Sequence, residues 1–260
     1  MKRNDIRKYL LGAALGVGVS VLVMPAVLAV PVMEAYAATQ VIRVGPSSLK
    51  AGTVVDGSDI RKNGISAYFT SSPISDAVFA RMYGKSYKED CTVPREDLRY
   101  LKVLYCGPDG QTYVGELVCH KDISQDLLEI FQELYDNFYM IEKMVLVDDY
   151  GGDDLKSAAD NNTSCFNYRL SSGESGTLSY HALGKAIDIN PLYNPYVWTD
   201  QGGEIHYEPE EGKTYSDREK IFSYKIEEED LCVGLFKEHG FTWGGSWGNG
   251  EKDYMHFSTR

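Results

Sequence analysis

The sequence predicts an α+β fold in which helices flank an antiparallel sheet. Two strand-like runs surround a glycine-containing turn, an amphipathic helix pattern comes after them, and short strand-like and helix-like segments then alternate to the C-terminus. The chain has 260 residues, of which 43% are hydrophobic, so it can bury a substantial core. We find no internal repeat and no low-complexity tract, which favours a globular domain.

The N-terminus has the pattern of a secretory signal. Four basic residues precede an uncharged run from Tyr9 to Met33, and Ala35-Tyr36-Ala37 then matches an A-x-A cleavage site. We interpret residues 1–37 as a cleaved signal peptide. An uncleaved membrane anchor stays open, because a spanning helix needs only about 20 apolar residues. On either interpretation we expect an extracytoplasmic protein, secreted or anchored at the cell envelope.

Residues 38–65 are polar, contain glycine and have no clear periodicity, so we expect a linker or a loose N-terminal arm. The folded domain is then 66–260. In it, LRYLKVLY (98–105) and TYVGELVC (112–119) predict a β-hairpin around the turn Gly107-Pro108-Asp109-Gly110. Apolar residues at helical spacing next predict an amphipathic helix over about 123–138.

The elements after residue 140 are shorter. MVLVDDY (144–150) predicts a short strand, and the Gly, Ser, Asn and Asp of 151–178 predict a long loop. KAIDIN (185–190) predicts a strand that Pro191 ends. Residues 199–220 read as a polar surface insertion. EEEDLCVGLFKEHG (227–240) predicts a helix with acids in its first turn, and FTWGG and YMHFS predict the last two strands.

The net charge and the cysteine pattern exclude several kinds of binding partner and site. Residues 1–37 hold four basic and two acidic residues, so their removal changes the net charge from −12 to −14. Nucleic acids and anionic membrane surfaces attract basic patches, so we expect neither as a partner of the mature protein. The five cysteines form no C-x-x-C pair and predict no particular disulfide. We expect a monomer.

Two histidines stand out, because each lies in an apolar, glycine-punctuated stretch with a nearby aspartate. Asp188 follows His181 by seven residues, and Asp253 precedes His256 by three. A carboxylate among apolar neighbours is costly unless something pairs with it, and a catalytic zinc takes three protein ligands. His181, Asp188 and His256 supply that set, and Asp253 remains as a general base for the attacking water. Two structural histidines with hydrogen-bonded aspartates remain the alternative.

The motifs resemble those of a known family. SYHALGKAID resembles the S-x-H-x-x-G-x-A-x-D signature of the bacterial D-alanyl-D-alanine carboxypeptidase and dipeptidase family of zinc peptidases, and DYMHF resembles its second motif. That family includes vancomycin-resistance enzymes and L-alanyl-D-glutamate endopeptidases, and it shares the hedgehog/DD-peptidase fold. GFTWGGSW resembles the endopeptidase branch, although Ser246 stands where that branch usually has aspartate.

The resemblance implies a zinc peptidase domain over 66–260 that cleaves stem peptides of peptidoglycan. It implies zinc ligands His181, Asp188 and His256, the base Asp253, and an upstream arginine, Arg169, that stabilises the oxyanion. We expect an L-alanyl-D-glutamate endopeptidase, with a D-alanyl-D-alanine carboxypeptidase as the alternative. A non-catalytic zinc-containing wall-binding module is an alternative of another class.

The remaining polar and aromatic features favour ordinary structural roles. His120, His206 and His239 read as structural or solvated residues. Trp243 and Trp247 suit either a substrate groove or the core. An acidic cluster near residue 150 matches no calcium-loop spacing, so we expect a solvated surface there; its members are Asp148, Asp149, Asp153 and Asp154.

Overall fold

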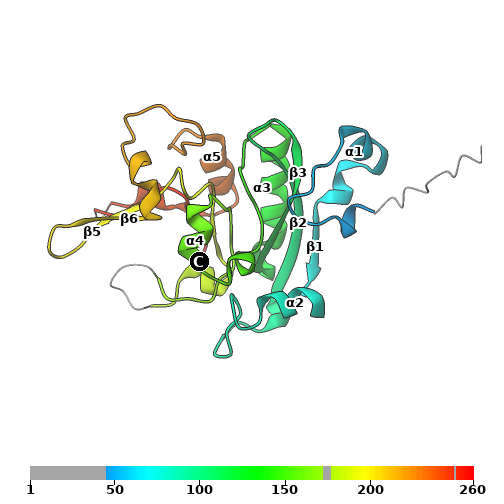
Figure 1. Ribbon diagram of the computed structural model, residues 1–260, viewed down its shortest axis with the longest axis horizontal. Helices are drawn as coiled ribbons and strands as arrows, with labels where there is room; N and C mark the ends of the chain where they lie inside the picture. Colours follow the sequence, from blue (N-terminus) through cyan, green and yellow to red (C-terminus); the bar gives the residue numbers. More distant parts are fainter. Residues whose placement is uncertain (1–44, 172–176, 249) are drawn as a thin grey trace, which may run out of the picture. The chain divides into compact units, whose positions relative to one another are not determined.

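The computed structural model describes residues 45–171, 177–248 and 250–260. In these residues the strands form three small antiparallel sheets, and helices pack beside them (Figure 1). The α+β prediction is confirmed at this level. The predicted signal peptide or anchor, residues 1–37, lies outside the described residues. Within them, no helix has the length and hydropathy that a membrane span requires.

The first sheet contains the predicted hairpin. Its strands are β1 (Thr70–Pro73), β2 (Leu98–Cys106) and β3 (Thr112–His120), in the order β1-β2-β3. In the hairpin register, Cys106 lies opposite Thr112 and Leu98 opposite His120. Gly110 has a positive φ of 74° in the connecting turn, which glycine adopts without strain. The sequence therefore predicted this hairpin correctly.

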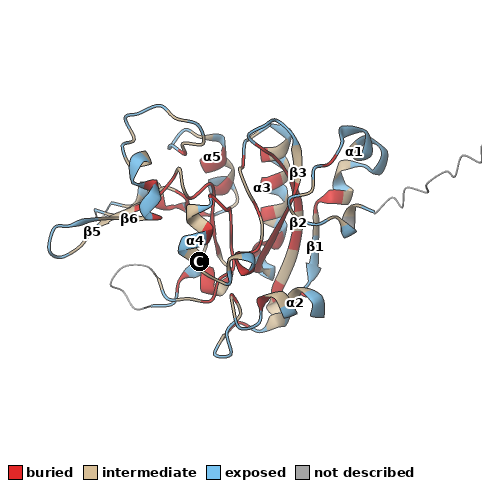
Figure 2. Cartoon of the chain, in the orientation of Figure 1, coloured by how far each residue is buried: buried red, intermediate tan, exposed pale blue. Residues whose placement is uncertain are grey.

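Helix α3 (Ser124–Asp136) packs against β2 and β1 and confirms the amphipathic helix expected over 123–138. Its buried residues recur at helical spacing, and Figure 2 colours these parts of the helix red where it meets the sheet. The apolar ones belong to the main hydrophobic core, which also reaches Ile187 and Phe257 in the C-terminal half. They are Leu127, Ile130, Phe131 and Leu134.

The described part of the expected linker, residues 45–65, packs against this sheet instead of forming a loose arm. The Gly52 N–H donates to Val114 O at 2.8 Å, and the Val55 N–H donates to Thr112 O at 2.8 Å. Val55 is buried in the core, and helix α1 (Gly57–Asn63) comes next. The chain here satisfies backbone groups at the edge of β3, a role that leaves no periodic pattern in the sequence.

The strand expected at 144–150 is not present. Residues 144–146 are extended, and Met144 O accepts a hydrogen bond from the Glu116 N–H at 3.0 Å, but they form no regular ladder. A 3-10 helix, η5 (Val147–Tyr150), then turns the chain. The reason is Asp148, whose buried carboxylate accepts a hydrogen bond from the Ser86 N–H at 3.1 Å and holds the turn against the preceding loop.

The loop expected at 151–178 contains a short helix, α4 (Asp154–Ala159), which Asp153 caps through the Lys156 N–H. After a turn at Asn161, where φ is +51°, the chain runs buried to Tyr168, between β3 and the C-terminal half. The Phe166 N–H donates to Val118 O at 2.9 Å. This segment therefore joins the first sheet to the second.

The C-terminal half holds the other two sheets. One has the order β4-β9-β7, and the other has the order β6-β5-β8. Strands β4, β7 and β9 confirm the three strands expected there. The expected surface insertion 199–220 is more ordered than predicted, since it supplies β6 and the 3-10 helix η7 (Glu210–Tyr215). The bounds are β4 Ala186–Asp188, β5 Tyr196–Thr199, β6 Ile205–Glu208, β7 Thr242–Trp243, β8 Lys252–Asp253 and β9 His256–Ser258.

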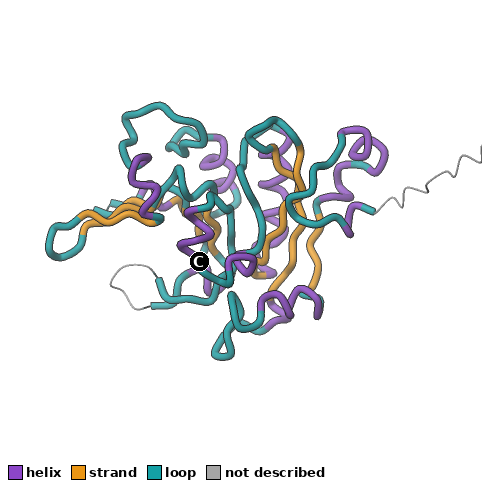
Figure 3. The backbone as a smooth tube through the Cα atoms, in the orientation of Figure 1, coloured by secondary structure: helices purple, strands orange, loops and turns teal. Residues whose placement is uncertain are grey.

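Helix α5 begins later than expected, at Leu231, and ends at Glu238. Asp230 is its N-cap and accepts a hydrogen bond from the Cys232 N–H at 2.7 Å, so the acids at 227–229 precede the helix. Figure 3 shows how short the C-terminal helices and strands are and how much loop joins them. The remaining elements are α2 (Asp76–Met82), η1 (Pro46–Ser48), η2 (Ile65–Tyr68), η3 (Arg95–Asp97), η4 (Lys121–Ile123), η6 (Tyr180–Leu183) and η8 (Gly244–Ser246).

Candidate active site

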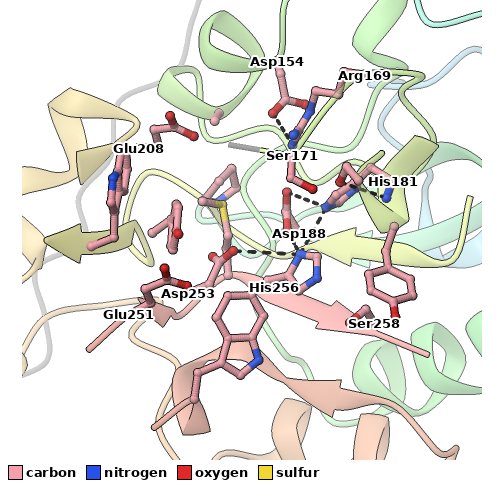
Figure 4. Close-up of a pocket in the computed structure, with 18 of the residues that line it drawn as sticks. Asp154, Arg169, Ser171, His181, Asp188, Glu208, Glu251, Asp253, His256 and Ser258 are labelled. Carbon is pink, nitrogen blue, oxygen red and sulfur yellow. Dashed lines mark hydrogen bonds and ion pairs between the residues drawn. The ribbon is translucent and has the colours of Figure 1, made fainter. Parts of the chain in front are cut away.

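His181, Asp188 and His256 lie together at the bottom of a pocket (Figure 4). His181 Nε2 is 3.1 Å from Asp188 Oδ2, and His256 Nδ1 is 3.1 Å from Asp188 Oδ1. The two ring nitrogens are 3.2 Å apart. All three residues are buried. The structure thus brings together the three residues that the sequence selected as metal ligands.

Local structure explains how the sequence places these three groups. Ser179 caps η6 by accepting a hydrogen bond from the His181 N–H. Gly184 then turns the chain with φ +66°, and its carbonyl accepts a hydrogen bond from the His120 N–H at 2.8 Å, so β4 starts at once. Asp188 at the end of β4 lies directly opposite His256 of β9. The register of one short strand pair therefore sets the contact between two residues far apart in sequence.

The outer nitrogen of His181 fixes the orientation of its ring. Nδ1 is 2.6 Å from Cys165 O, and a carbonyl oxygen only accepts, so Nδ1 carries the proton. Nε2 is then left to face Asp188 and His256. Burial opposes ionisation of Asp188, but His181 and His256 outweigh it and hold the pKa of that carboxyl well below its ordinary range. Burial likewise opposes protonation of His181, but Asp188 raises the pKa of its imidazole.

Asp253 lies beside this group, in β8. Its Oδ2 is 4.0 Å from His256 Nδ1, and its Oδ1 is buried with no hydrogen-bond partner among the described residues. Burial raises the pKa of Asp253 to about 8, although His256 and Arg169 oppose the shift. The backbone of Gly244 approaches Asp253 so closely that an added Cβ would lie 2.6 Å from Asp253 O. A carboxyl with a pKa near neutrality suits general acid–base work.

The pocket above these groups has a volume of about 680 Å³, within the ordinary range for ligand sites. Its described lining is rich in carboxylates and aromatic rings. Tyr196 stacks on Trp198 with ring centroids 4.7 Å apart, and Trp247 lies 5.7 Å from the His256 ring. The carboxylates that line it are Asp154, Asp188, Asp200, Glu208, Glu251 and Asp253, and the guanidinium groups are those of Arg169 and Arg260.

Arg169 lines the pocket on the side of α4, as Figure 4 shows. Its Nη2 is 2.6 Å from Asp154 Oδ2, and its Nη1 donates to Leu170 O at 3.2 Å. Burial opposes its charge, but Asp154 and Asp188 outweigh this and raise the pKa of the guanidinium. Arg169, the arginine selected from the sequence, therefore lies in the pocket. Its partner there is Asp154, a pairing that the sequence did not predict.

The acidic cluster is only in part the solvated surface that we expected, since Asp149 is exposed but Asp148 is buried. Asp148 is buried against Ser86, and Asp149 pairs with Arg81 at 3.2 Å. Asp153 caps α4, and Asp154 pairs with Arg169. Asp153 has a local partner, whereas the partners of Asp148, Asp149 and Asp154 come from other parts of the chain, on which sequence spacing contains no information.

Three other histidines have different partners. His239, at the end of α5, lies 3.0 Å from Asp126, and His120 accepts a hydrogen bond from the Asp122 N–H. His206 is half-buried instead of fully solvated. It stacks on Trp198 and lies 3.1 Å from Asp200. His206, Asp200 and Glu204 form a second, more exposed group of possible metal donors.

The tryptophans and Ser246 divide between core and pocket. Trp243 is buried, and its indole N–H donates to Tyr254 O at 2.9 Å, so it supports the sheet. Trp247 lines the pocket. Ser246 donates to Trp243 O at 2.7 Å and closes the turn η8, away from the three ligand atoms. The five cysteines are all free thiols.

Several pocket residues escaped the sequence reasoning. Tyr196, Trp198 and Glu208 enter the pocket from β5 and β6, which the sequence indicated only in part as a polar insertion. The alternation in YVWT was the available signal for β5. No local signal marks the Cys165 carbonyl, because any residue could supply it.

Two buried histidines and an aspartate, beside a further carboxyl and at the base of a pocket, form the kind of site that metal-dependent hydrolases use. Residues 172–259 match the profile of a protein family described as D-alanyl-D-alanine carboxypeptidase. This match confirms the family resemblance predicted from the two motifs, and it covers His181, Asp188, Asp253 and His256. Arg169 and Asp154 lie outside it. No curated protein and no solved structure matches the chain.

Proposed function

We propose that this protein is a zinc-dependent peptidase that hydrolyses the stem peptides of bacterial peptidoglycan. One observation carries the proposal: the imidazole nitrogens of His181 and His256 lie 3.2 Å apart, and each is 3.1 Å from one oxygen of the Asp188 carboxylate, beside Asp253. The matching family segment gives the reaction class. Each of these four residues lies in that segment.

The donor set fits zinc in number, type and spacing. Zinc sites that act in catalysis use three protein ligands of His, Asp or Glu type. With bonds of about 2.0–2.2 Å, neighbouring donors of a tetrahedral site lie about 3.3–3.6 Å apart. The two imidazole nitrogens are 3.2 Å apart and each contacts a different oxygen of Asp188 at 3.1 Å, so the three side chains lie close enough together for one ion. The hydrogen bond from His181 to Cys165 O is the outer-sphere contact that such ligands usually have.

A zinc ion at these residues would supply Lewis acidity for the scissile carbonyl and for the attacking water. We assign to Asp253 the roles of accepting the proton of that water and of returning it to the leaving amine, since its carboxyl lies beside His256 and its buried Oδ1 has no hydrogen-bond partner among the described residues. We assign to Arg169, which lines the same pocket, the stabilisation of the negative charge that develops on the carbonyl oxygen. Trp247 and Tyr196 form a wall that limits the access of bulk water.

We favour the bond between L-alanine and D-glutamate. In this bond and in D-alanyl-D-alanine alike, the residue after the scissile bond has the D configuration and carries a free α-carboxyl group, which suits Arg169. The two substrates differ in the length of peptide beyond that residue. The pocket extends along β5 and β6 beyond the size of one alanine, and its acidic wall suits the amine of the diamino acid that stem peptides carry third. The family description favours the alternative, a D-alanyl-D-alanine carboxypeptidase.

Mass spectrometry of purified muropeptides tests the proposal and separates the two bonds. An endopeptidase releases a peptide that begins with D-glutamate and leaves L-alanine on the muramic acid. A carboxypeptidase releases free D-alanine and leaves the stem attached. D-alanine as the sole product would replace our first choice with the second. Absence of cleavage by zinc-loaded protein would reject both and favour the wall-binding module.

We also propose that residues 1–37 direct the protein out of the cytoplasm, where its substrate lies. The basic start, the uncharged run and the A-x-A site support this. N-terminal sequencing of the protein from cell fractions tests it. A mature N-terminus near Ala38 is expected for a cleaved signal, and an intact chain in the membrane fraction identifies an anchor. An intact chain in the cytoplasm would contradict both.

A further inference from the structure

Asp154 is the first residue of α4, and its carboxylate points toward the pocket (Figure 4). Its side chain is 23% exposed, although it belongs to a run of acids that the sequence suggested would be solvated. It lies outside the matching family segment, which begins at residue 172. Asp153, the preceding residue, points away to cap α4 and to pair with Lys156.

Both oxygens of Asp154 are engaged by groups of the site. Oδ2 is 2.6 Å from Arg169 Nη2, and Oδ1 accepts a hydrogen bond from Asn167 Nδ2 at 3.2 Å. Asn167 is 2% exposed, and its backbone N–H donates to His181 O at 3.1 Å. Asp154 is therefore connected both to the arginine and, through a buried asparagine, to the segment that carries His181.

Arg169 lies near enough to the candidate centre to interact electrostatically with its carboxylates. The Asp188 carboxylate helps to raise the pKa of Arg169, and Arg169 in turn opposes the rise in the pKa of Asp253. A long arginine side chain has many rotamers, and a guanidinium contributes to catalysis only when it is held in place before the reaction. Asp154 contacts Nη2 and Leu170 O accepts from Nη1, so both terminal nitrogens are held at the pocket wall, and Nε is buried with no hydrogen-bond partner among the described residues.

We propose that Asp154 is a positioning residue that holds the Arg169 guanidinium in the pocket, oriented toward the reacting carbonyl of the substrate. This inference rests on the proposed function for its catalytic effect. The immobilisation of Arg169 by Asp154 is a property of the protein chain alone and is measured separately.

The experiment compares Asp154→Asn, Asp154→Glu and the matched control Asp153→Asn. Asparagine keeps the shape and the helix-capping ability of aspartate, so the control changes only an acid that points away from the pocket. We expect Asp154→Asn to lower kcat on muropeptides by about 10- to 100-fold, the cost typical of a misplaced group, with zinc content unchanged. Asp154→Glu should recover part of the loss, and Asp153→Asn should retain the wild-type kcat.

A double-mutant cycle separates positioning from an independent role. In an Arg169→Ala background, Asp154→Asn should change kcat by less than about two-fold, because the group that it positions is gone. Equal losses in both backgrounds would overturn the proposal. A wild-type kcat for Asp154→Asn would also overturn it. Failure of both Asp154 variants to fold would overturn it as well, because Asp154 would then be required for the stability of the fold.

A readout without metal or substrate tests the first half of the proposal. In protein labelled with ¹⁵N at arginine, the Nε–Hε signal of Arg169 should be distinct and rigid in the wild type. In Asp154→Asn it should move toward the signals of mobile arginines. An unchanged signal would overturn the proposal. If the wild-type protein cleaves no muropeptide while this signal responds as expected, the proposed function fails and the anchoring of Arg169 by Asp154 stands.

Discussion

His181 meets the candidate metal centre with the tautomer of its ring already fixed by Cys165 O. Its Nε2 is thus available as a ligand, in contact with Asp188 and His256. Such an arrangement reduces the reorganisation needed when a metal binds. The site therefore depends on a backbone carbonyl that a side-chain substitution at Cys165 would leave in place.

The first prediction concerns zinc content. We expect His181→Ala to lose most of the bound zinc and nearly all peptidase activity, because two ligands hold zinc far more weakly than three. Elemental analysis of the purified variant measures this. His239→Ala is the matched control, since His239 pairs with Asp126 at the end of α5 and should leave zinc at the wild-type level. A fully active protein without metal would contradict the prediction.

The second prediction concerns Asp253. Asp253→Asn should keep its fold and its zinc while kcat falls by about 10²- to 10⁴-fold, the usual contribution of a general base. Asparagine has nearly the same shape, so the loss would come from proton transfer and not from packing. Steady-state kinetics on a purified muropeptide, together with metal analysis, measure both quantities. Near-wild-type turnover would place the base elsewhere.

At the scale of elements, the turn between η6 and β4 sets the distance between His181 and Asp188. Gly184 adopts φ +66°, and a Cβ there would lie 2.7 Å from the nitrogen of the His120 N–H group that bonds to this turn. The hairpin strand β3 and the ligand-bearing strand β4 are thereby held together. A side chain at this position would disturb both sheets.

The third prediction concerns this turn. Gly184→Ala should lower the free energy of unfolding by about 1–3 kcal/mol, because alanine is strained at this φ, and it should also weaken zinc binding. Gly234→Ala is the control. Gly234 lies within α5 with open space around it, so alanine should raise the free energy of unfolding by about 0.5–1 kcal/mol. Chemical denaturation of both variants measures the difference. Equal effects would remove the special role of the turn.

An ion pair between the partly exposed Arg81 and the buried Glu116 joins α2 to the hairpin. Arg81 donates to both oxygens of Glu116, at 2.9 and 2.6 Å, and Tyr100 also donates to Glu116. Burial opposes ionisation of Glu116, but these hydrogen bonds outweigh it and keep the pKa of Glu116 below its ordinary value. A carboxyl with a lowered pKa stabilises the fold at pH values above its unfolded-state pKa, which is about 4.3 for glutamate. This contribution disappears as the pH falls through the folded-state pKa.

The fourth prediction is the corresponding pH dependence. The free energy of unfolding should decrease as pH falls below about 4.3, and Glu116→Gln should show a smaller decrease. At pH 7 the substitution should cost about 1–3 kcal/mol, because it leaves Arg81 with a weaker partner. Urea denaturation at several pH values measures this. Asp217→Asn, which breaks an exposed pair with Lys220, should change little. Parallel pH curves for wild type and Glu116→Gln would contradict the prediction.

At the scale of the whole molecule, residues 45–65 belong to the folded unit. Val55 is 6% exposed and joins the main core, whereas its neighbour Val54 is 47% exposed. The segment closes an edge of β3 with backbone hydrogen bonds. The folded domain therefore begins before residue 66, the boundary that the sequence predicted.

The fifth prediction compares the two valines. Val55→Ala should lower the free energy of unfolding by about 1–3 kcal/mol through the lost burial and the cavity left behind, and Val54→Ala should have little effect. Thermal or chemical denaturation of the two variants measures the contrast. If both are neutral, residues 45–65 are the loose arm that the sequence suggested.

Local patterns in the sequence determined the hairpin β2–β3, helix α3 and the group of His181, Asp188 and His256 in the site. The alternation of apolar and polar residues in strands and the helical spacing of apolar residues are properties of residues that are close in sequence. They can therefore be recognised without a structure. The candidate metal ligands His181, Asp188 and His256 could be selected from the sequence because motif spacing reflects the geometry that one site requires. The family match over residues 172–259 agrees with that spacing.

Tertiary structure alone decided the packing of residues 45–65, the turn at Asp148 and the pairing of Asp154 with Arg169. Each depends on partners from a different part of the chain. A polar segment reads as a loop until the edge strand that it covers is known, and an aspartate reads as solvated until its arginine is known. The physical reason is that buried backbone groups and buried charged groups need partners. The sequence does not record which partners the fold brings near them.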